Sequence, residues 1–380
     1  MRFPEFTEEW VNVSLKDVAD FQKERISSGL LDESTYISTE NILQNFQGVQ
    51  SAISIPANTN VVAYKKNDIL LSNIRPYLKK VWFSDRIGGC SADVFVLRSK
   101  TCEPEFLYNV IASDKFINYV MSGAKGVKMP RGDKNQMESF SFSIPAVVEQ
   151  RKISRLFQLL DERIVTQNKI IEKLQSLIKG IVVSHYSTTA HIIKVRIREL
   201  GEAYSTMVMS KEQLTNDGNL CVFYGELFTL YDCVIDEVKS RTSLEKVSST
   251  LSHGRDLLFP ASTTVDAVSL IAPSALMQKD IILGGDMFGI KVSEAYNPIY
   301  LSYYFNYIAN KRLAKYAKGT TIIHLHYNEI ANVAIELPNI EEQDKIVSTI
   351  LEYSAKLSIE ETILEKLFDL KQYLLKQLFI

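Results

Sequence analysis

Cysteine is scarce in this chain of 380 residues, and its four copies form no closely spaced pair. Cys90, Cys102, Cys221 and Cys233 lie far apart without a Cys-x-x-Cys motif, which argues against a disulfide framework and against a zinc site. No uninterrupted apolar run approaches the ~18 residues of a transmembrane helix. The first residues are followed by no apolar run of signal-peptide length. We therefore expect a cytoplasmic protein with no membrane association.

Signatures of catalysis are missing as well. Residues 123–128 lack the spacing of a phosphate-binding loop. His324 and His326 could offer two metal ligands, but no third ligand is near in sequence. No arrangement of serine, histidine and aspartate suggests a nucleophile. These absences favour a binding protein without a metal or cofactor of its own.

One segment keeps an enzymatic alternative open. Asn297-Pro298-Ile299-Tyr300 resembles the Asn-Pro-Pro-Tyr box with which adenine methyltransferases hold a flipped base. It lacks the second proline, and no glycine-rich nucleotide loop precedes it at the end of a strand. We interpret it as the start of a helix, and a standalone adenine methyltransferase remains the alternative function.

Basic charge is clustered although the formal net charge is only −2. Residues 1–60 hold 4 Lys/Arg against 9 Asp/Glu, whereas residues 61–134 hold 13 Lys/Arg against 7 Asp/Glu. Residues 311–327 contain four Lys/Arg and no acidic residue. Such clustering is what a local phosphate-binding surface requires, although ordinary solvated faces would produce it too.

The most informative feature is an internal repeat. Residues 144–153 (IPAVVEQRKI) match residues 337–346 (LPNIEEQDKI) at an offset of 193. The same offset aligns Asp93-Val94-Phe95 with Asp286-Met287-Phe288 and Lys125-Gly126 with Lys318-Gly319. Upstream the offset shrinks to 188, where residues 68–71 meet 256–259, and to 182, where residues 15–18 meet 197–200. The chain is therefore two copies of one unit, each a globular part followed by a helix.

The globular parts, residues 1–144 and 192–337, are expected to be mixed α/β (α+β) domains. Apolar runs such as Val94–Leu97 and Asp280–Leu283 predict strands. The residues around Pro4 and Gly284-Gly285-Asp286 are typical of turns. A helix is predicted to open just after Pro298.

The two remaining segments, residues 145–186 and 338–380, are expected to be long helices. Their apolar residues alternate at spacings of four and three, which is typical of a coiled coil. The predicted pairing residues are Ile153, Phe157, Leu160, Ile164, Gln167, Ile171 and Leu174 in the first helix, and Ile346, Ile350, Leu357, Glu360, Leu364 and Leu367 in the second. At Lys371 the pattern breaks, and Leu370 is expected to replace it. The alternative is two unrelated amphipathic helices that each cap their own domain.

Two polar residues occupy equivalent seam positions. Gln167 is the fifth of nine seam residues, and Glu360 follows it at the same offset of 193. We predict an antiparallel helix pair, related by a pseudo-two-fold axis, in which these two side chains face each other and fix the register. The alternative is that both turn toward solvent or a partner.

The sequence also resembles a known family along essentially its whole length. Residues 2–6 (RFPEF) with Trp10, residues 36–42 (YISTENI) and residues 68–78 (DILLSNIRPYL) resemble the specificity subunits of Type I restriction–modification systems. The Pro-x-x-x-Glu-Gln-x-x-Ile junction at Pro145 and again at Pro338 is the most recognisable element, and the end of the chain, residues 364–379, fits as well. The second copy departs from the pattern because it lacks the RFPEF-like opening.

This resemblance implies a non-catalytic protein with two target-recognition domains, each reading one part of a bipartite site in double-stranded DNA. The paired helices would separate the domains and dock two methyltransferase subunits, and motor–nuclease subunits would join for restriction. S-adenosylmethionine, ATP and magnesium would belong to those partners. A helix over residues 149–186 would be about 57 Å long at ~1.5 Å per residue, enough to hold two readers about one DNA turn (~34 Å) apart.

Candidate DNA contacts follow from side-chain chemistry and repeat position. Lysine usually meets phosphate, whereas arginine can also make a bidentate contact to guanine. The candidates in the first copy are Arg75, Tyr77, Lys79, Lys80, Trp82, Lys125, Lys128, Arg131 and Lys134, and those in the second are Arg255, Lys318, Thr320, Thr321, His324 and Tyr327. A coiled-coil scaffold with no DNA role is a further alternative.

Overall fold

The structure, a computed structural model, describes residues 2–189 and 192–378. The outer bounds predicted for the first domain and the last helix, residues 1 and 380, lie outside the described residues. So does Phe379, the last residue of the segment that resembles the family. The chain divides into two compact units. Unit 1 holds residues 1–169 and 361–380, and unit 2 holds residues 170–360. Each unit therefore contains one globular part and a portion of two long helices, α5 (Val147–Thr188) and α9 (Ile340–Leu378).

Unit 1 is built on two four-stranded sheets. Its strands are β1 (Val11–Ser14), β2 (Ala19–Phe21), β3 (Arg25–Ser27), β4 (Tyr36–Ile37), β5 (Asn60–Tyr64), β6 (Ile69–Ser72), β7 (Val81–Phe83), β8 (Gly88–Cys90), β9 (Val94–Ser99) and β10 (Ser141–Ile144). Its short helices are α1 (Leu15–Val18), α2 (Pro104–Ile111), α3 (Asp114–Ser122) and α4 (Lys134–Glu138). The sheet orders are β2-β9-β6-β7 and β3-β5-β8-β4, and β1 pairs with β10. Strand β6 is central and buried on both faces, as its apolar run requires.

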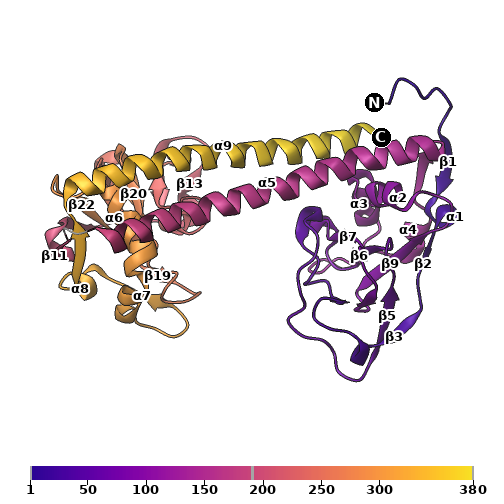
Figure 1. Cartoon of the computed structure of the whole chain (residues 1–380), viewed down its shortest axis with the longest axis horizontal. Coiled ribbons are helices and arrows are strands. Elements are labelled where there is room, and N and C mark those ends of the chain that lie inside the picture. The colour runs from indigo at the N-terminus through magenta and orange to yellow at the C-terminus, as the bar shows by residue number, and fades with distance from the viewer. Residues whose placement is uncertain (1, 190–191, 379–380) are drawn as a thin grey trace. The chain divides into compact units, whose positions relative to one another are not determined.

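Unit 2 repeats this plan with longer sheets. Its strands are β11 (Ile192–Arg196), β12 (Gly201–Ser205), β13 (Leu214–Thr215), β14 (Asn219–Phe223), β15 (Val234–Ile235), β16 (Ser240–Thr242), β17 (Leu251–His253), β18 (Asp256–Pro260), β19 (Ser262–Thr263), β20 (Ser274–Leu276), β21 (Lys279–Gly284), β22 (Met287–Val292), β23 (Ile323–His324) and β24 (Ala334–Pro338). Its short helices are α6 (Pro298–Tyr304), α7 (Asn310–Leu313) and α8 (Tyr327–Ile330). The sheet orders are β12-β22-β18-β20-β15 and β13-β16-β14-β21-β17. Figure 1 shows α6 close to both α5 and α9 within this unit.

The duplication predicted from the sequence recurs in the strand pairing. In unit 1, Phe21 of β2 faces Leu97 of β9; in unit 2, Ala203 of β12 faces Ile290 of β22. These pairs are related by the offsets 182 and 193 found in the sequence. The predicted strands at Val94–Leu97 and Asp280–Leu283 are confirmed as β9 and β21, and the helix predicted just after Pro298 is α6, which begins at the proline itself. The mixed α/β fold class is therefore confirmed in both copies.

A buried glutamine explains the repeated Pro-x-x-x-Glu-Gln junction. In unit 1 the Gln150 amide donates to the carbonyl of Pro145 (2.8 Å) and accepts from the backbone N–H of Glu103 (2.9 Å). In unit 2 Gln343 makes the same two bonds, to Pro338 (2.8 Å) and from Asn297 (2.9 Å). Glu103 and Asn297 immediately precede α2 and α6. Each glutamine thus ties the start of a long helix to the start of a short one.

Within unit 1 the portions of α5 and α9 run antiparallel. Ile153 and Phe157 near the start of α5 share a core with Leu374, Leu375 and Leu378 near the end of α9. Lys371, by contrast, corrects a prediction. It is 4% exposed and donates to Asp161 of α5 (2.6 Å), whereas Leu370 is 44% exposed. The heptad position therefore holds the lysine, because its ammonium finds a carboxylate there, and Leu370 does not take its place.

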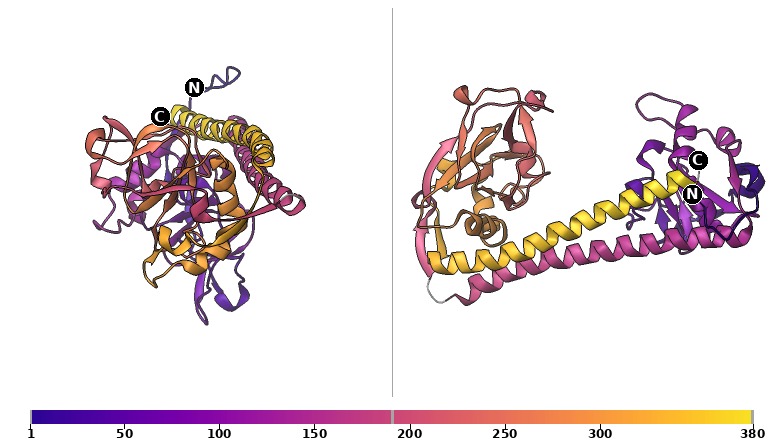
Figure 2. Two further views of the ribbon diagram at one scale, coloured as in Figure 1. Left: turned by 90° about the vertical axis from the view of Figure 1, so that its left-hand side faces the viewer. Right: turned by 90° about the horizontal axis from the view of Figure 1, so that it is seen from above.

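Within unit 2 the two helices are again antiparallel, as Figures 1 and 2 show. Ile178 and Val182 of α5 share a core with Ile346, Val347 and Ile350 of α9. The buried seam residues are Ile153, Phe157, Ile164, Gln167, Ile171, Leu174, Ile346 and Ile350, while Leu160, Leu357, Glu360, Leu364 and Leu367 are partly exposed. The predicted contact between Gln167 and Glu360 stays a prediction. Among the described residues, no helix is both long and apolar enough to cross a membrane.

Candidate nucleic-acid interface

A closed loop at residues 125–131 organises the basic segment of unit 1. Lys125 and Arg131 exchange two backbone hydrogen bonds, each 2.9 Å long. Gly126 has a φ of 98°, which only glycine adopts readily. The loop is anchored because the backbone N–H of Arg75 donates to Pro130 (2.8 Å) and Ile74 forms a β-bridge with Arg131. The structure therefore brings Arg75 together with this loop.

Residues 318–324 form the same loop in unit 2. Lys318 and His324 exchange two backbone hydrogen bonds, of 2.9 and 2.7 Å. Gly319 has a φ of 123°, and an added Cβ would lie 2.0 Å from the carbonyl oxygen of Ile322. Ser262 pairs with His324 as Ile74 does with Arg131. Both loops thus have the same backbone framework although few of their side chains agree.

A carboxylate stands at the same place beside each loop. In unit 1 Arg131 Nη1 lies 2.9 Å from Asp93 Oδ1, and in unit 2 His324 Nδ1 lies 3.7 Å from Asp286 Oδ2. All four residues obey the offset of 193. The carbonyls of Asp93 and Asp286 accept hydrogen bonds of 2.8 Å from Asn73 and Ala261, which hold the two turns in place. Each loop therefore ends in a side chain that a fixed carboxylate faces.

The lysine that opens each loop is held by an acidic residue, Asp133 at the N-cap of α4 or Glu329 of α8. Lys125 Nζ lies 3.0 Å from Asp133, and Lys318 Nζ lies 2.9 Å from Glu329. The hydrogen bond from Lys125 keeps the pKa of Asp133 below its ordinary value. The backbone N–H of His326, followed by Lys318, lowers the pKa of Glu329. Both carboxylates thus stay ionised beside their lysines.

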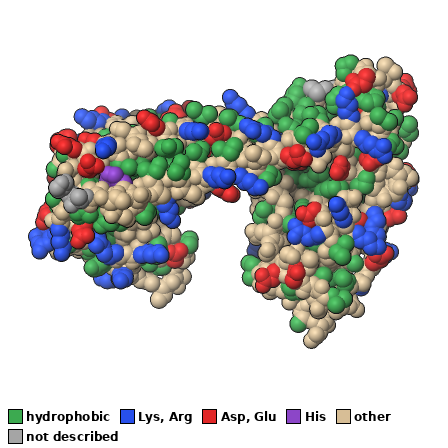
Figure 3. Space-filling view, viewed as in Figure 1, with side chains coloured by type: hydrophobic (Ala, Val, Ile, Leu, Met, Phe, Trp, Pro, Cys, Tyr) green, Lys and Arg blue, Asp and Glu red, His purple; other side chains and the backbone are tan. Residues whose placement is uncertain are grey.

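The tips of the loops are exposed to solvent. Val127 and Met129 are 103% and 47% exposed, and Ile322, which is equivalent to Met129, is 50% exposed. Lys128, Thr320 and Thr321 are exposed as well. Figure 3 shows Lys and Arg side chains on the visible face of each unit with acidic side chains between them, so the basic charge forms local clusters. An exposed tip with mixed apolar and cationic groups can reach into a groove of a ligand.

The other candidates of unit 1 lie in or after the turn of residues 76–78. Tyr77 is 48% exposed, while Lys79 is ion-paired with Asp114 and Lys80 donates to the carbonyl of Thr39. Trp82 is only 7% exposed and packs edge-on against Tyr64 in the core. Lys79 and Lys80 thus have partners within the protein and Trp82 is largely buried, whereas Tyr77 is open to solvent.

The three further candidates, Lys134, Tyr327 and Arg255, each contact other residues of the protein. Lys134 opens α4, where its ammonium lies 5.0 Å from the ring of Phe21, and the equivalent Tyr327 opens α8 against Phe288. Arg255 donates to the carbonyls of Val292, Ser293 and Tyr296 at 3.3, 3.1 and 2.6 Å. Its guanidinium thus clamps the end of β22.

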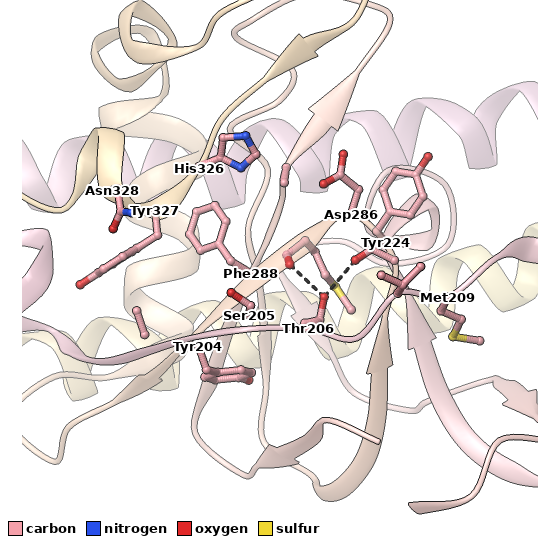
Figure 4. A pocket seen from close by; sticks show the side chains of 15 residues that line it. Tyr204, Ser205, Thr206, Met209, Tyr224, Asp286, Phe288, His326, Tyr327 and Asn328 are labelled. Carbon is pink, nitrogen blue, oxygen red and sulfur yellow. Dashed lines mark hydrogen bonds between the residues drawn. The ribbon is translucent and has the colours of Figure 1, made fainter. Parts of the chain in front are cut away.

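Unit 2 has a hollow of 920 Å³ beside its loop, and it was not anticipated from the sequence. Figure 4 shows Phe288 and Thr206 between Tyr327 and His326 on one side and Tyr224 and Met209 on the other. Thr206 Oγ1 donates to Gly285 and Met287, each at 2.9 Å. In unit 1 the position of Ala203 is taken by Phe21, whose ring packs 5.4 Å from Phe95. The smaller side chain leaves this space open in unit 2.

The residues considered for catalysis have structural roles here. Asn297 caps α6, accepting hydrogen bonds from the N–H groups of Ile299 (2.9 Å) and Tyr300 (3.2 Å), and the Tyr300 side chain is 1% exposed. This is the predicted helix start. The four cysteines are buried, and burial raises the pKa of each thiol to about 12, so none is a reactive thiolate. Among the described residues, no cluster of His, Cys, Asp and Glu could hold a metal ion.

Two important residues escaped the residue-by-residue sequence interpretation. Asp93 and Asp286 aligned in the repeat but were not considered as part of the interface, because an acidic side chain does not bind phosphate. Asp93 and Asp286 are separated by 193 residues, as are Arg131 and His324, and this shared offset was the signal that could have found them. The hollow of unit 2 could have been anticipated only from the alignment of Phe21 with Ala203.

Comparison with known proteins places these features in a family. The Type I restriction modification DNA specificity domain matches residues 7–176 and again residues 193–368. The MjaVIII specificity subunit of Methanocaldococcus jannaschii is 23% identical over 368 residues, which cover 88% of this chain and 84% of that protein. The EcoDI specificity subunit of Escherichia coli is 23% identical over 187 residues, 47% of this chain and 42% of that subunit. The match thus spans less than half of the E. coli relative.

Solved structures agree on the fold. A chain from work on complex assembly and conformational transition of the type I R-M system has a TM-score of 0.59 at 18% identity, with 97% of each chain covered. The S subunit of a Type I restriction-modification system from M. genitalium has a TM-score of 0.59 at 14% identity, covering 98% of this chain and 96% of that one. The resemblance inferred from sequence is confirmed: the chain belongs to the family of Type I restriction–modification DNA specificity domains and carries two of them.

Proposed function

We propose that this chain reads a two-part sequence in double-stranded DNA, with one part read by each specificity domain. The observation that carries this proposal is the duplicated loop framework at residues 125–131 and 318–324. Two copies of one framework in one chain suit two half-sites, because a repeated protein contacts DNA at repeated positions. Their differing side chains suit half-sites of different sequence.

The chemistry of the loops fits a nucleic-acid ligand. In unit 1, Arg75, Lys128 and Arg131 place three exposed cations around one loop. In unit 2, the equivalent loop offers Lys318 and His324 with two exposed threonines. Cations supply the sequence-independent attraction to phosphate, whereas hydroxyl, imidazole and guanidinium groups can also reach base edges. Tyr77, Lys79, Lys80, Lys134 and Tyr327 would lie at the margin of these contacts.

The chain would also bind other protein subunits. Two methyltransferase subunits and the motor–nuclease subunits would dock on this chain in the cytoplasm, and they would bind S-adenosylmethionine, ATP and magnesium. Exposed apolar side chains on the long helices support such docking. On α9, Ile359, Leu370 and Tyr373 are 61%, 44% and 53% exposed, and on α5 Val165 is 52% exposed.

The direct test is DNA binding by the chain together with its methyltransferase partner. Genome-wide sequencing of methylated bases in the host would first define the target. Affinity for a duplex with that target is then compared with affinity for a scrambled duplex at several salt concentrations. We expect a clear preference for the target and a steep salt dependence for both duplexes. Equal affinity for the two duplexes would refute sequence reading.

Two controls separate the alternative functions. The chain alone, incubated with labelled S-adenosylmethionine and DNA, is expected to transfer no label, since Asn297 and Tyr300 form a buried helix start. Transfer by the chain alone would establish a standalone methyltransferase. A complex that assembles normally but binds no DNA would instead identify a coiled-coil scaffold.

A further inference from the structure

The two domains place different side chains at one equivalent position. Arg131 closes loop 125–131, and His324 closes loop 318–324. Each is paired through its backbone to the neighbouring segment at Ile74 or Ser262, and each faces a carboxylate from the turn before β9 or β22. The framework is therefore shared, and the side chain that it presents differs.

This combination is what reading two different sequences requires. Residues that contact phosphate need not change between half-sites, because the DNA backbone is the same in both. Residues that read bases must change, because each base pair presents its own set of donors and acceptors in the major groove. Arginine and histidine differ in this respect: the guanidinium offers five donors in a fork, and a neutral imidazole offers one donor and one acceptor.

The carboxylates restrict how these side chains can lie. Arg131 is 53% exposed at its side chain, yet one guanidinium nitrogen is held 2.9 Å from Asp93. A single ion pair leaves the remaining N–H groups of the fork available for a ligand. Asp93 itself is fixed because its carbonyl accepts the N–H of Asn73. A side chain ordered before binding loses less entropy on contact, so the pair favours one direction of approach.

We propose that Arg131 and His324 each read bases of one half-site, an inference that rests on the proposed function. Asp93 positions Arg131, and Asp286 positions His324. Arg131 bonds a guanine of the first half-site through O6 and N7, which is the contact that a guanidinium fork matches. His324 makes a single hydrogen bond to a base edge of the second half-site. Lys125, Lys128 and Lys318 contact phosphate.

The experiment uses the full chain in complex with its methyltransferase partner. Duplexes carry the target found by sequencing methylated bases, with each base pair of one half-site replaced in turn. Arg131→Ala is expected to abolish discrimination at one guanine position, lowering the preference for that base roughly 5- to 150-fold, the range for one bidentate pair. Discrimination in the other half-site stays unchanged. His324→Ala does the reverse, with a smaller loss.

Further variants distinguish recognition of a base from electrostatic attraction to phosphate. Arg131→Lys keeps the positive charge without the fork, so we expect it to lose discrimination at that guanine and to retain the salt dependence. Lys128→Ala is the matched control on the same loop, and it should weaken binding to all duplexes alike. Asp93→Asn should reduce discrimination at the same guanine, with unchanged affinity for scrambled DNA and an unchanged melting temperature.

The outcomes separate this inference from the function on which it rests. If the unaltered complex shows no preference for its target, the proposed function fails. If the unaltered complex is selective and Arg131→Ala weakens all duplexes equally, Arg131 is a phosphate contact and the inference is overturned. Retained discrimination in Arg131→Ala, or loss of preference at a position other than guanine, overturns it as well.

Discussion

At the scale of single residues, Gln150 and Gln343 tie the first turns of the long helices to the starts of α2 and α6. Each is at most 2% exposed, and each satisfies one carbonyl and one backbone N–H that lie about 40 residues apart in the chain. Glutamine is suited to this position because its amide donates and accepts at once. The glutamine of the repeated junction thus has the same structural cause in both copies.

Replacing this glutamine should destabilise its own unit. Gln150→Leu leaves the carbonyl of Pro145 and the N–H of Glu103 without their partner, at a cost of about 1–3 kcal/mol. Gln343→Leu should have the same effect in unit 2. Thermal unfolding measures the loss. Gln175→Leu, an exposed position on the same helix as Gln150, is the control and should change stability little. Equal melting temperatures for all three variants would contradict the assigned role.

The basic residues around loop 125–131 make a second prediction. Replacing Lys125, Lys128 and Lys134 with alanine should weaken DNA binding about equally for all sequences. The slope of log affinity against log salt should flatten by about 0.9 for each phosphate that the variant no longer neutralises. Because Lys125 and Lys134 already face Asp133 and Glu138, we expect Lys128→Ala to account for the largest single change. An unchanged slope in the triple variant would exclude this loop from the interface.

Side-chain chemistry alone did not show which of the candidate residues lie together and which have partners within the protein. Arg75 and the residues of loop 125–131 are brought together because their backbones pair. Trp82 and Arg255 looked equally suitable in the sequence, but Trp82 packs in the core and Arg255 binds three backbone carbonyls. Residue type indicates what a group can do, whereas burial and competing partners decide whether it is available.

At the scale of elements, helices α5 and α9 show that heptad spacing predicts a helix but not which residue of the other helix each seam residue contacts. Heptad spacing predicted both helices and most buried positions. It could not show that Lys371 is satisfied by Asp161, because the carboxylate comes from the other helix. The equivalent positions in unit 2 are Ile178 and Ser354, an apolar and an uncharged residue. The repeat is thus interrupted by one buried ion pair.

This ion pair should be costly to break and easier to replace. Lys371→Ala removes a charged hydrogen bond, and the partly exposed Asp161 regains some hydration, so we expect a loss of about 1.5–3 kcal/mol. Combining Lys371→Ile with Asp161→Ser copies the residues of unit 2 and should recover much of that stability. Urea unfolding of the purified chain provides the comparison. A double variant as unstable as Lys371→Ala would show that the repeat positions are not equivalent.

Strands were predicted best where an apolar run is buried on both faces, as in β9 and β21. Short strands such as β19 and β23 could not be predicted, since each is only two residues long and exists through its partner. The hollow beside α8 has the same origin, because its lining combines residues of different strands, among them Ala203 of β12 and Phe288 of β22. Long-range pairing therefore defines the details of the candidate site.

At the scale of the whole molecule, duplication links the sequence to the function. Offsets of 182, 188 and 193 residues align the strands, the junction glutamines and the closed loops of the two copies. A complete reader is therefore expected in each copy, with the two loops free to differ in sequence preference. The central claim is that each domain determines one half of the DNA target independently.

Exchanging one domain tests this claim most directly. Residues 192–337 are replaced by the matching domain of a relative with a different target, and methylated bases are sequenced across the genome of a host that carries the chain with its methyltransferase. We predict that one half of the methylated motif changes to that of the relative while the other half stays the same. A motif in which both halves change, or in which neither does, would contradict independent reading by two domains.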